Sequence, residues 1–522
     1  MKRFDIVICG ASLGGVIAAY SASKSSKSVL LIEETKWIGG QLTSQAVPPD
    51  EHEWIESEGS TKSYMDYRKK VREYYISDPN FKRTILDKKE LKNVSDMTFC
   101  PASSEVSRIS HPPKLALKFL YEMLNPYIGK NLTIILDAKL VSCERVNDRI
   151  KSVKYLIDGS IEEFTGDIFL DATDTGELLY LSKTEYRVGA ESKEETGEEH
   201  APLIKNENDV QPFTYSLAFK IHKDGNYVIE KPKEYEYYKK MMMPYDKYPI
   251  LSMYGPDSST HKAKRFGLYY NEFDESNNEL FPLLVYRRIV AKDNYINNSD
   301  IDDITLLNWP QNDYFMGNLY NTNNIEEEKT KAKALTLSLF YYLQTEAPNP
   351  KGGIGNPNFE LLYDELGSSD GLSLAPYIRE SRRAVTKFII KEEMIKKGSN
   401  TIFSDSVGVG SYPIDIHITT STHSFFFIPT ERFNIPLGAM IPIKTKNLIP
   451  SCKNIGTTHI TNGSYRLHPI EWNIGEVAGY LASYALERCV DIDEVYSNKE
   501  MLKDFQSLLK KNGIQLYWGE RG

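Results

Sequence analysis

The sequence predicts an α/β fold built around a βαβ unit at its beginning. Residues 4–9 read as a buried strand, residues 10–15 as a glycine-rich turn, and the residues up to Tyr20 as a helix of small side chains. A second apolar run, residues 28–32, ends in Glu33 and Glu34. Strand, turn, helix, strand and terminal acid follow one another in the order of a dinucleotide-binding unit.

The glycine turn departs from the ideal pattern at one position. Gly10 permits the tight turn, and the helix that follows offers free N–H groups to a pyrophosphate. A strict G-x-G-x-x-G would place glycine where this chain has Ser12, but Gly14 and Gly15 keep the helix entry narrow. Glu33 lies 23 positions after Gly10, near the spacing of about 20 expected for an acid that holds a ribose hydroxyl.

Two other interpretations of this segment stay open. Residues 6–20 could form the apolar core of a signal peptide that begins with Lys2 and Arg3. Asp5, the glycine cluster and the strand that follows argue against it, and a motif that begins at residue 4 leads us to expect no targeting segment. A doubly wound fold without a cofactor is the second alternative.

Composition excludes several classes of protein. With 522 residues, the chain can hold two or more domain-sized units. A net charge of −9 disfavours nucleic acid or an anionic membrane as a partner. No apolar run approaches the roughly 18 to 20 residues of a membrane span, so we expect no membrane partner and a cytoplasmic location. The five cysteines are widely separated, which predicts neither a metal site nor a disulfide framework.

A second glycine pair follows the βαβ unit. Gly39 and Gly40, with the polar residues Gln41 and Thr43, predict a loop that a flat ligand can approach closely. In a flavin protein the isoalloxazine ring would lie here. The alternative is a turn that only ends the crossover.

The middle of the chain predicts further helices and strands. Apolar periodicity predicts helices over residues 61–76, 114–127, 324–346 and 384–397. Residues 132–138 read as a strand, and residues 140–155 as paired strands of a β-meander turning at 146–148. A strand ending at Asp171 is expected to return to the first sheet, with its carboxyl end at the ligand crevice. Residues 210–310 suggest a largely β region that covers the substrate.

The last quarter carries a second signal. A strand-like run over residues 447–456 precedes a polar loop and a helix over residues 470–487. Gly475, Ala478 and Gly479 on that helix permit tight packing, and its N-terminus can face an anion or charge on a flavin. The glycine clusters at 352–355 and 408–410 are not framed by strand and helix, so no second nucleotide fold for NAD(P)H is expected.

Taken together, the βαβ unit, the second glycine pair and the C-terminal loop and helix resemble those of the FAD-dependent oxidoreductases of the two-dinucleotide-binding-domain, glutathione-reductase-like superfamily. Within it, the resemblance is to a bacterial family of about this length. The matching segments run through the whole chain: residues 37–51, 308–314, 342–348, 376–383 and 456–476.

The resemblance implies a discontinuous, Rossmann-like FAD-binding domain with an inserted α+β substrate domain. The FAD domain would comprise residues 1–50, 130–185 and 425–490. Residues 51–129 and 186–424 would form the substrate or cap domain, and residues 491–522 a C-terminal extension.

The resemblance also implies the residues that contact FAD. Gly10, Ser12, Gly14 and Gly15 would hold the pyrophosphate, and Glu33, with Glu34 beside it, the adenosine ribose. Leu140 would meet adenine through its backbone, and Asp171 would stand at the crevice. The other expected contacts lie along the ribityl chain and flavin ring: Gly39, Gly40, Gln41, Thr43, Asn473, Ile474 and Gly475.

Oxidation of an alcohol or amine by a flavin needs a base and a C–H bond aimed at flavin N5. His468, with Arg466 nearby, is the first candidate base, and His417 and His423 are second candidates. A structural role for His468 in its loop stays open. His459, expected on a strand, is interpreted as structural.

Arginines supply candidate substrate contacts. Arg379, Arg382 and Arg383 could clamp a carboxylate or phosphate, as could Arg287 and Arg288. If 379 and 382 share a helix face, an ion-pair network with Glu380 explains them equally well.

The sequence thus predicts an FAD-dependent oxidase or dehydrogenase that takes hydride from a small polar substrate. Oxygen or a carrier would reoxidise the flavin. Two alternatives remain: a reductase of an unsaturated or carboxylate-bearing substrate, and a flavoprotein that uses FAD structurally. The assembly state stays open, and a homo-oligomer is among the states allowed.

Overall fold

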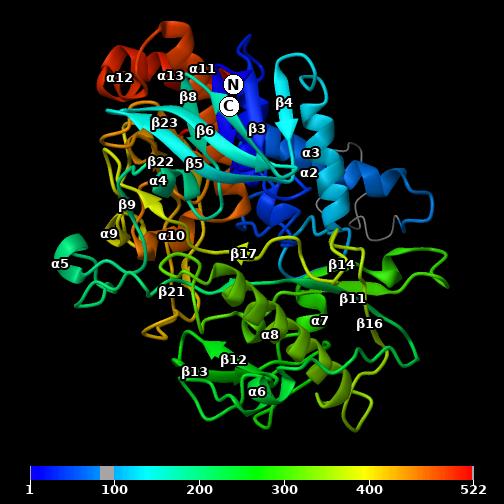
Figure 1. The fold of residues 1–522 in the computed structure, drawn as a ribbon. Helices are drawn as coiled ribbons and strands as arrows, with labels where there is room; N and C mark the ends of the chain where they lie inside the picture. Colours follow the sequence, from blue (N-terminus) through cyan, green and yellow to red (C-terminus); the bar gives the residue numbers. More distant parts are fainter. Residues whose placement is uncertain (1, 83–98, 520–522) are drawn as a thin grey trace.

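A five-stranded parallel sheet lies in the upper part of the molecule as drawn in Figure 1. The computed structural model describes residues 2–82 and 99–519. All strands of the sheet are short and apolar, in the order β23 (Leu448–Pro450), β8 (Ile168–Asp171), β2 (Ile6–Cys9), β3 (Val29–Ile32) and β4 (Leu132–Ile135). Both faces of this sheet are covered, which is why its strands are apolar at nearly every position. The predicted βαβ unit and the return of the strand that ends at Asp171 are confirmed.

Two helices from opposite ends of the chain cover one face of the sheet. These are α1 (Leu13–Ala22) and α11 (His468–Arg488). The two helices lie so close that a Cβ at Gly475 would be 2.2 Å from the Gly14 carbonyl oxygen, and only glycine fits there. The same would hold at Gly479, 2.2 Å from the Ala18 oxygen. The small residues predicted to allow tight packing do so against α1.

The predicted β-meander covers the other face. Its strands β5 (Ala138–Val146), β6 (Arg149–Ile157) and β7 (Ser160–Thr165) pair in sequence, and β1 (Lys2–Arg3) joins at the edge. Val153, Tyr155 and Phe164 pack against Val7 and Leu30 of the central sheet.

A second hydrophobic core lies between residues 213 and 378, coloured green to yellow at the far end of Figure 1. The antiparallel strands β14 (Arg288–Val290), β15 (Asp303–Leu307), β11 (Leu217–Ile221) and β16 (Phe359–Leu361) form its sheet. The helix α8 (Ile325–Thr345) packs on it through Leu335, Leu339 and Phe340. By contrast, α2 (Lys62–Ser77) and α3 (Pro113–Leu124) contribute to the first core. The division into domains stays a prediction, and residues 83–98 of it lie outside the described residues.

Short elements complete the fold. The strands are β9 (Tyr186–Arg187), β10 (Phe213–Thr214), β12 (Tyr254–Asp257), β13 (Lys262–Arg265), β17 (Tyr377–Ile378), β18 (Arg383–Ala384), β19 (Ser406–Gly410), β20 (Ile414–Ile416), β21 (Phe426–Ile428) and β22 (Phe433–Pro436). The short helices are α4 (Glu177–Leu181), α5 (Lys193–Thr196), α6 (Tyr235–Lys240), α7 (Leu283–Tyr286), α9 (Glu392–Ile395), α10 (His459–Tyr465) and α12 (Ile492–Ser497). In the C-terminal extension, α13 (Lys499–Lys511) buries Phe505 and Leu509 in the first core.

Two predicted elements are wrong. Residues 384–397 are not one helix: Ala384 pairs with Tyr186, Ile390 bridges to Thr457, and only α9 is helical. The β-branched and apolar side chains of this segment are buried in extended form instead. His459 begins a helix rather than lying on a strand, because the side chain of Thr458 accepts a hydrogen bond from the Thr461 N–H and caps α10.

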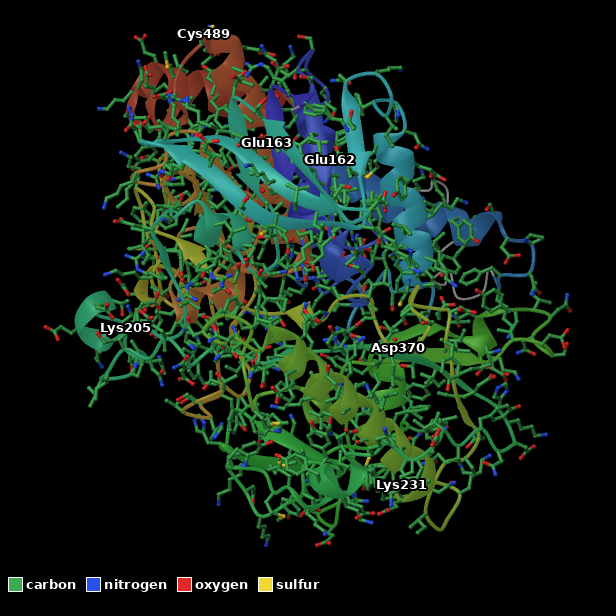
Figure 2. All side chains as sticks on the ribbon, in the orientation of Figure 1. Glu162, Glu163, Lys205, Lys231, Asp370 and Cys489 are labelled. Carbon is green, nitrogen blue, oxygen red and sulfur yellow. The ribbon has the colours of Figure 1, made fainter. Side chains whose placement is uncertain are left out.

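Most charged side chains point outward. Lys205, Lys231 and Asp370 are exposed on separate parts of the molecule, as is Cys489 at the end of α11 (Figure 2). Within the described part of the chain, no helix has the length and apolar character needed to cross a membrane. Some charged groups are buried, and among them Asp171 ends the parallel strand β8, while Lys453 follows β23.

The packing of α11 on α1 predicts the effect of adding one methyl group. In an open helix, Gly→Ala adds stability through helix propensity. At Gly475 the Cβ would strike backbone, so we expect Gly475→Ala to lower the free energy of unfolding by about 1–3 kcal/mol, as overpacking does. Denaturant unfolding measures this change. Glu487→Ala, at an exposed position of the same helix, should leave stability unchanged, and equal stability of both variants would contradict the packing argument.

Candidate active site at the carboxyl edge of the parallel sheet

The glycine turn forms where β2 ends. Gly10 has a φ of +89°, and a Cβ there would lie 2.5 Å from the Ala172 oxygen at the end of β8. Ser12 is the N-cap of α1, and its hydroxyl accepts a hydrogen bond from the Gly15 N–H at 3.3 Å. Serine is a preferred N-cap residue, which accounts for its place in the motif. Gly15 lies in the first turn, where a Cβ would meet the Gly10 oxygen.

Glu33 closes the turn at the end of β3. Its carboxylate accepts hydrogen bonds from the Ala11 N–H at 2.6 Å and the Thr35 N–H at 3.0 Å. Burial raises the pKa of Glu33 to about 7, against the lowering effect of these two N–H groups. Glu34, one residue further, is exposed. A carboxylate has about four acceptor sites, so Glu33 can still accept from a ligand hydroxyl.

A cavity of about 770 Å³ opens beside this turn. Its walls come from the strand ends, the meander, the loop after Gly40 and the segment at 374–378. Among the residues that line it are Gly10, Glu33, Glu34, Leu140, Tyr155, Thr173, Asp174, Gln45, Ala375 and Pro376. Four predicted cofactor contacts, Gly10, Glu33, Glu34 and Leu140, therefore share one cavity.

The second glycine pair lies against the first. Gly39 has a φ of +110°, and a Cβ at Gly40 would lie 2.8 Å from the Ser12 Cα. The side chain of Thr43 donates to the Ile38 oxygen at 2.5 Å and holds the loop in shape. The amide of Gln41 donates to Glu471 at 2.6 Å, while its Oε1 and both amide atoms of Gln45 are buried without a partner.

A buried carboxylate joins this loop to the two long helices. Glu471, in the first turn of α11, accepts the Gly14 N–H at 3.1 Å and lies 3.4 Å from the Nζ of Lys453. Lys453 also pairs with Asp174. Burial raises the pKa of Glu471 although Lys453 opposes the shift, and both carboxylates together raise the pKa of Lys453 against its burial. An acid thus already occupies one N–H donor at the start of α1.

These features fit a dinucleotide. The glycine turn leaves backbone free of side chains, and Glu33 has acceptor capacity left. The amide of Gln45, which lines the cavity, and the Oε1 of Gln41 are buried without a partner. Buried polar groups are normally hydrogen-bonded, so such a group of exceptions indicates a missing ligand.

The sequence pattern of the family described as FAD dependent oxidoreductase matches residues 5–509, nearly the whole chain. The chain belongs to this family. FAD is therefore its cofactor, and the protein is a flavoenzyme.

Solved structures with similar segments are other flavoenzymes. A geranylgeranyl bacteriochlorophyll reductase-like protein from Thermoplasma acidophilum is 12% identical, with a TM-score of 0.33 over 99% of this chain and 85% of that one. L-proline dehydrogenase from P. horikoshii is 13% identical, with a TM-score of 0.18 over 36% of this chain and 24% of that one. The p-nitrophenol 4-monooxygenase PnpA from Pseudomonas putida is 9% identical, with a TM-score of 0.24 over 42% and 47%. These TM-scores are too low to add to the assignment. No curated protein matches the sequence.

The remaining predicted FAD contacts of this oxidoreductase lie at the same edge but are engaged within the protein. The carboxylate of Asp171 accepts from Thr173 and from the Leu179 N–H, and so shapes the turn after β8. Gly475 packs on Gly14, and Ile474 belongs to the first core. Asn473 donates to the Val407 oxygen at 3.3 Å, although its Oδ1 has no partner.

A second group of polar residues lies next to the loop, around Arg466. Its guanidinium donates to the Tyr377 hydroxyl at 2.8 Å and the Asp415 backbone oxygen at 3.2 Å, while its Nε has no partner. Asp50 and Tyr412 interact electrostatically with it, and the Tyr412 hydroxyl donates to Asp50 at 3.4 Å. Burial raises the pKa of Asp50 to about 6 despite two nearby guanidinium groups.

His468 uses both ring nitrogens on the backbone of the loop over residues 39–50. Its Nδ1 accepts the Asp50 N–H at 3.0 Å, and its Nε2 lies 3.2 Å from the Val47 oxygen. Burial lowers the pKa of His468 to about 3, so the ring is neutral at physiological pH. The two hydrogen bonds fix where Asp50 stands.

The other two candidate histidines lie further along the chain and in different surroundings. His417 is held between Asp313, at 2.6 Å, and Asp415, at 3.3 Å. Asp415 also faces Arg466, so His417 adjoins the polar group. His423 contacts the Thr419 oxygen at 3.1 Å and the ring of Phe315, and no ion pair links it to that group among the described residues.

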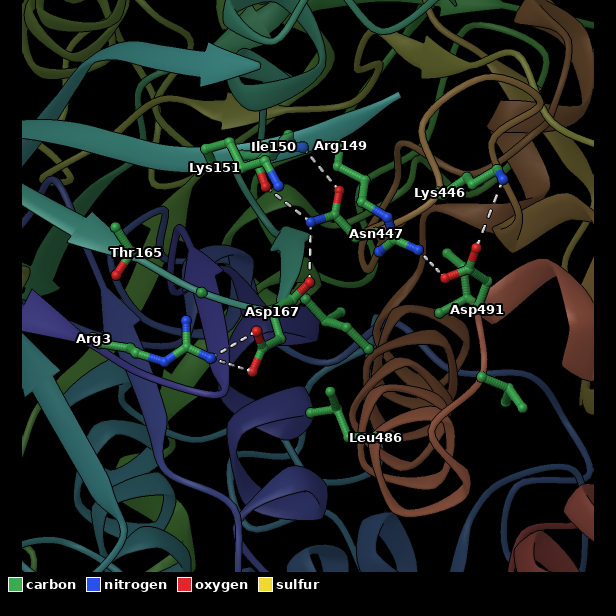
Figure 3. Close-up of a pocket in the computed structure, with 14 residues that line it drawn as sticks. Arg3, Arg149, Ile150, Lys151, Thr165, Asp167, Lys446, Asn447, Leu486 and Asp491 are labelled. Atoms are coloured by element: carbon green, nitrogen blue, oxygen red, sulfur yellow. Dashed lines mark hydrogen bonds and ion pairs between the residues drawn. The ribbon is translucent and has the colours of Figure 1, made fainter. Parts of the chain in front are cut away.

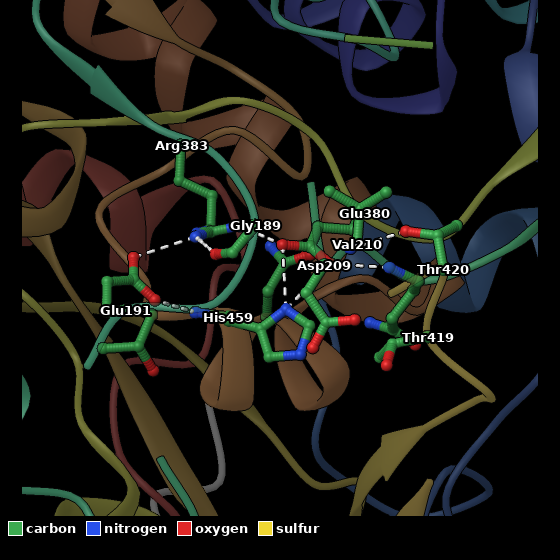
Figure 4. A network of polar contacts seen from close by, with 12 residues as sticks. Gly189, Glu191, Asp209, Val210, Glu380, Arg383, Thr419, Thr420 and His459 are labelled. Carbon is green, nitrogen blue, oxygen red and sulfur yellow. Dashed lines mark hydrogen bonds and ion pairs between the residues drawn. The ribbon is translucent and has the colours of Figure 1, made fainter. Parts of the chain in front are cut away.

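The three candidate arginines are not on one helix, because β17 and β18 are extended strands. Arg379 pairs with Asp313 at 2.8 Å, and Arg382 with Glu177 at 3.1 Å. Arg383 pairs with Glu191 and Glu380, and Glu380 also binds His459 (Figure 4). These arginines therefore form ion pairs within the protein, the second of the two interpretations that the sequence allowed.

Another cavity, of about 570 Å³, lies at the opposite, amino edge of the sheet (Figure 3). Its wall includes Thr165, Gly166 and Asn447, just before β8 and β23. Arg3 pairs with Asp167, and Arg149 and Lys446 pair with Asp491. This cavity is remote from the glycine turn, and these three cations have partners.

Sequence reasoning missed Asp50, Gln45, Lys453, Asp174 and Glu471. Two weak signals were available, since Asp50 and Gln45 stand in the segment after the second glycine pair. Lys453 and Glu471 flank the last strand and helix, but only the fold reveals that their charges are buried together.

Filling the cavity should abolish cofactor binding. Ala375 is half-buried and lines the cavity, so we expect Ala375→Trp to fold but to lose the visible flavin absorption of the purified protein. Ala334→Trp, at a half-buried alanine on α8, should keep it. If Ala375→Trp bound FAD as well as the unaltered protein, the cofactor would lie elsewhere.

The depressed pKa of His468 predicts a pH-dependent stability. The folded-state pKa is about 3 and the unfolded value about 6.5, so the unfolded chain takes up the proton first. The contribution of His468 is complete above about pH 6.5 and falls by about 1.4 kcal/mol per pH unit below it. We expect the stability difference between the unaltered protein and His468→Asn, measured by denaturant unfolding, to shrink from pH 7.5 to pH 5. A constant difference would show that His468 is not a buried neutral ring.

Proposed function

We propose that this oxidoreductase oxidises a small polar substrate, an alcohol or amine, that binds beside Asp50. The observation that carries the proposal is the half-buried carboxylate of Asp50, whose pKa is raised. Asp50 ends the loop over residues 39–50, and its backbone contacts His468 at the N-terminus of α11. We further infer that the protein belongs with the glutathione-reductase-like flavoproteins, and that residues 1–50, 130–185 and 425–490 form its FAD domain. Gly10, Glu33 and Leu140 line one cavity, which supports this arrangement.

Bound FAD supplies a two-electron acceptor for the hydride of the substrate. The protein contributes binding and proton transfer. The turn at Gly10 admits the pyrophosphate, Glu33 would accept from a ribose hydroxyl, and Leu140 would face adenine. Gln45 lines the cavity, and its unpartnered amide and the free Oε1 of Gln41 would offer hydrogen bonds to the part of the cofactor near Gly39 and Gly40.

Asp50 has the properties of a general base. An effective base has a pKa near the working pH, and burial brings the pKa of Asp50 to about 6. The carboxylate is only half-buried and accepts one long hydrogen bond, 3.4 Å from the Tyr412 hydroxyl. It therefore retains acceptor capacity for an O–H or N–H proton.

His468 and Arg466 would position and tune this base. His468 holds the backbone of residues 47–50 from α11, and so it acts through Asp50 rather than on the substrate. Arg466 lowers the pKa of Asp50 and keeps the carboxylate ionised against burial. His417, between two aspartates, is the remaining candidate for proton transfer.

The same group of residues would also serve a reductase of an unsaturated, carboxylate-bearing substrate. The observation in its favour is that burial promotes the protonated form of Asp50, which could then donate a proton. Anaerobic bleaching of the flavin by an alcohol or amine supports oxidation, whereas reoxidation of a chemically reduced flavin by an unsaturated acid supports reduction.

Asp50→Asn tests the proposed base. We expect FAD binding to persist and the rate of anaerobic flavin reduction to fall by ~10²–10⁴-fold, the usual contribution of general base catalysis. In the unaltered enzyme the rate should rise with pH through about 6, because the ionised carboxylate is the active form, and the variant should lack this limb. Stopped-flow absorbance measures both.

Asp405→Asn is the matched control. Asp405 is also a half-buried aspartate whose pKa burial raises, but it binds the Gly438 N–H away from the cavity. Its rate and pH profile should be unchanged. Equal rates in Asp50→Asn and Asp405→Asn would remove Asp50 from the mechanism.

A further inference from the structure

Arg287 is a buried guanidinium with unused hydrogen-bond donors. It follows α7, is 6% exposed, and its Nε and Nη1 have no partner. Its one hydrogen bond runs from Nη2 to the Tyr286 hydroxyl at 3.3 Å, and the Tyr286 ring lies 4.8 Å away. A guanidinium offers five N–H donors, so most of those of Arg287 point at no acceptor.

The other buried arginines of the described chain show how unusual this is. Each has a carboxylate within 4 Å: Arg68 (2.7 Å), Arg72 (2.6 Å), Arg379 (2.8 Å), Arg382 (3.1 Å), Arg383 (2.8 Å) and Arg466 (3.5 Å). Among residues 2–82 and 99–519, no carboxylate comes that close to Arg287. A buried charge without a counter-ion is costly to the folded state, so a residue of this kind calls for an anion from outside the chain.

Arg287 faces the same groups as Arg466. Asp50, Tyr377 and Tyr412 interact electrostatically with both guanidinium groups. The Nε of Arg466, which is 3% exposed, is unpartnered too. Two buried arginines from different parts of the chain thus keep unpartnered donors, and both interact electrostatically with the proposed base.

Asp50 does not serve as the missing counter-ion. It forms no ion pair within 4 Å of either arginine among the described contacts. Its pKa is raised to about 6, whereas His417 and Arg466 lower the pKa of the neighbouring Asp415 to about 2 against its burial. Asp415 lies in an ion pair with Arg466 at 3.5 Å, whereas Arg287 lowers the pKa of Asp50 only from beyond ion-pair distance.

We propose that Arg287, with the free Nε of Arg466, binds the carboxylate of the substrate. The assignment rests on the proposed function, because it places the anion next to Asp50. It narrows the substrate class to small hydroxy or amino carboxylic acids, whose carboxylate a guanidinium binds through two parallel hydrogen bonds. Arg379, Arg382 and Arg383 have carboxylate partners within the protein and take no part.

Ligand-observed NMR with propionate and propionamide tests the site. Saturation transfer is measured at constant ionic strength on the protein as purified, with and without added FAD. We expect propionate to bind and its neutral amide to bind far more weakly. Arg287→Gln should weaken propionate binding at least ~10-fold, the loss typical of a hydrogen bond to a charged group.

Arg288→Gln is the matched control, because the adjacent arginine pairs with Asp303 at 3.1 Å. It should bind propionate normally. Equal binding of propionate and propionamide, or unchanged binding in Arg287→Gln, would overturn the proposal. Since this readout needs no flavin reduction, propionate binding that depends on Arg287 would stand even if no substrate ever bleached the flavin.

Stability separates a binding arginine from a structural one. Removing an unpaired buried charge relieves its desolvation, so we expect Arg287→Met to keep or raise the thermal midpoint without ligand. Arg383→Met, which strips Glu191 and Glu380 of their partner, should lower it markedly. If Arg287→Met lowered the midpoint as much as Arg383→Met, Arg287 would be structural and the proposal would fail.

Discussion

The contact between Gly14 and Gly475 is the constraint on which the rest of the site depends. No side chain fits between α1 and α11 at this point, so the first and last quarters of the chain share one edge of the sheet. Glu471 can then reach the Gly14 N–H, Gln41 and Lys453 at once. An internal carboxylate near the glycine turn repels phosphate, and Lys453 offsets that charge. If pyrophosphate binds at the glycine turn as proposed, groups from three separate segments would balance the charge around it.

Hydrogen bonds from α11 also hold the loop that contains Asp50, the proposed base. His468 begins the helix and binds the backbone at Val47 and Asp50, on the loop that starts with Gly39 and Gly40. Because the ring is neutral, it can accept from one N–H and donate to one carbonyl. The position of the Asp50 backbone is thus tied to the same helix, α11, that packs on α1.

Local patterns predicted the βαβ unit, the meander and the long helices, because each depends on periodicity and turn residues within a short window. The same reasoning failed for residues 384–397, whose apolar residues are buried by strand contacts with Tyr186 and Thr457. The sequence grouped Gly10, Glu33 and Leu140, which line one cavity in the structure, and their contacts with FAD stay a prediction. The contacts of His468 with the backbone at Val47 and Asp50 could not be predicted, since they depend on burial and on which ring nitrogen meets which backbone group. Arg287 and Arg383 look alike in sequence, and only their tertiary surroundings tell them apart.

The buried arginines fall into two kinds, those that pair with a carboxylate of the protein and Arg287, which has no carboxylate within 4 Å among the described residues. Arg379, Arg382 and Arg383 each pair with an acid from a distant segment, so their charges are neutralised within the protein. Arg287 has no carboxylate partner among the described residues, although the six other buried arginines each have one. Binding an anion there would neutralise the guanidinium and lessen its pull on Asp50, whose pKa would rise. An anionic substrate would therefore make the neighbouring carboxylate more basic at the moment when a proton has to be removed.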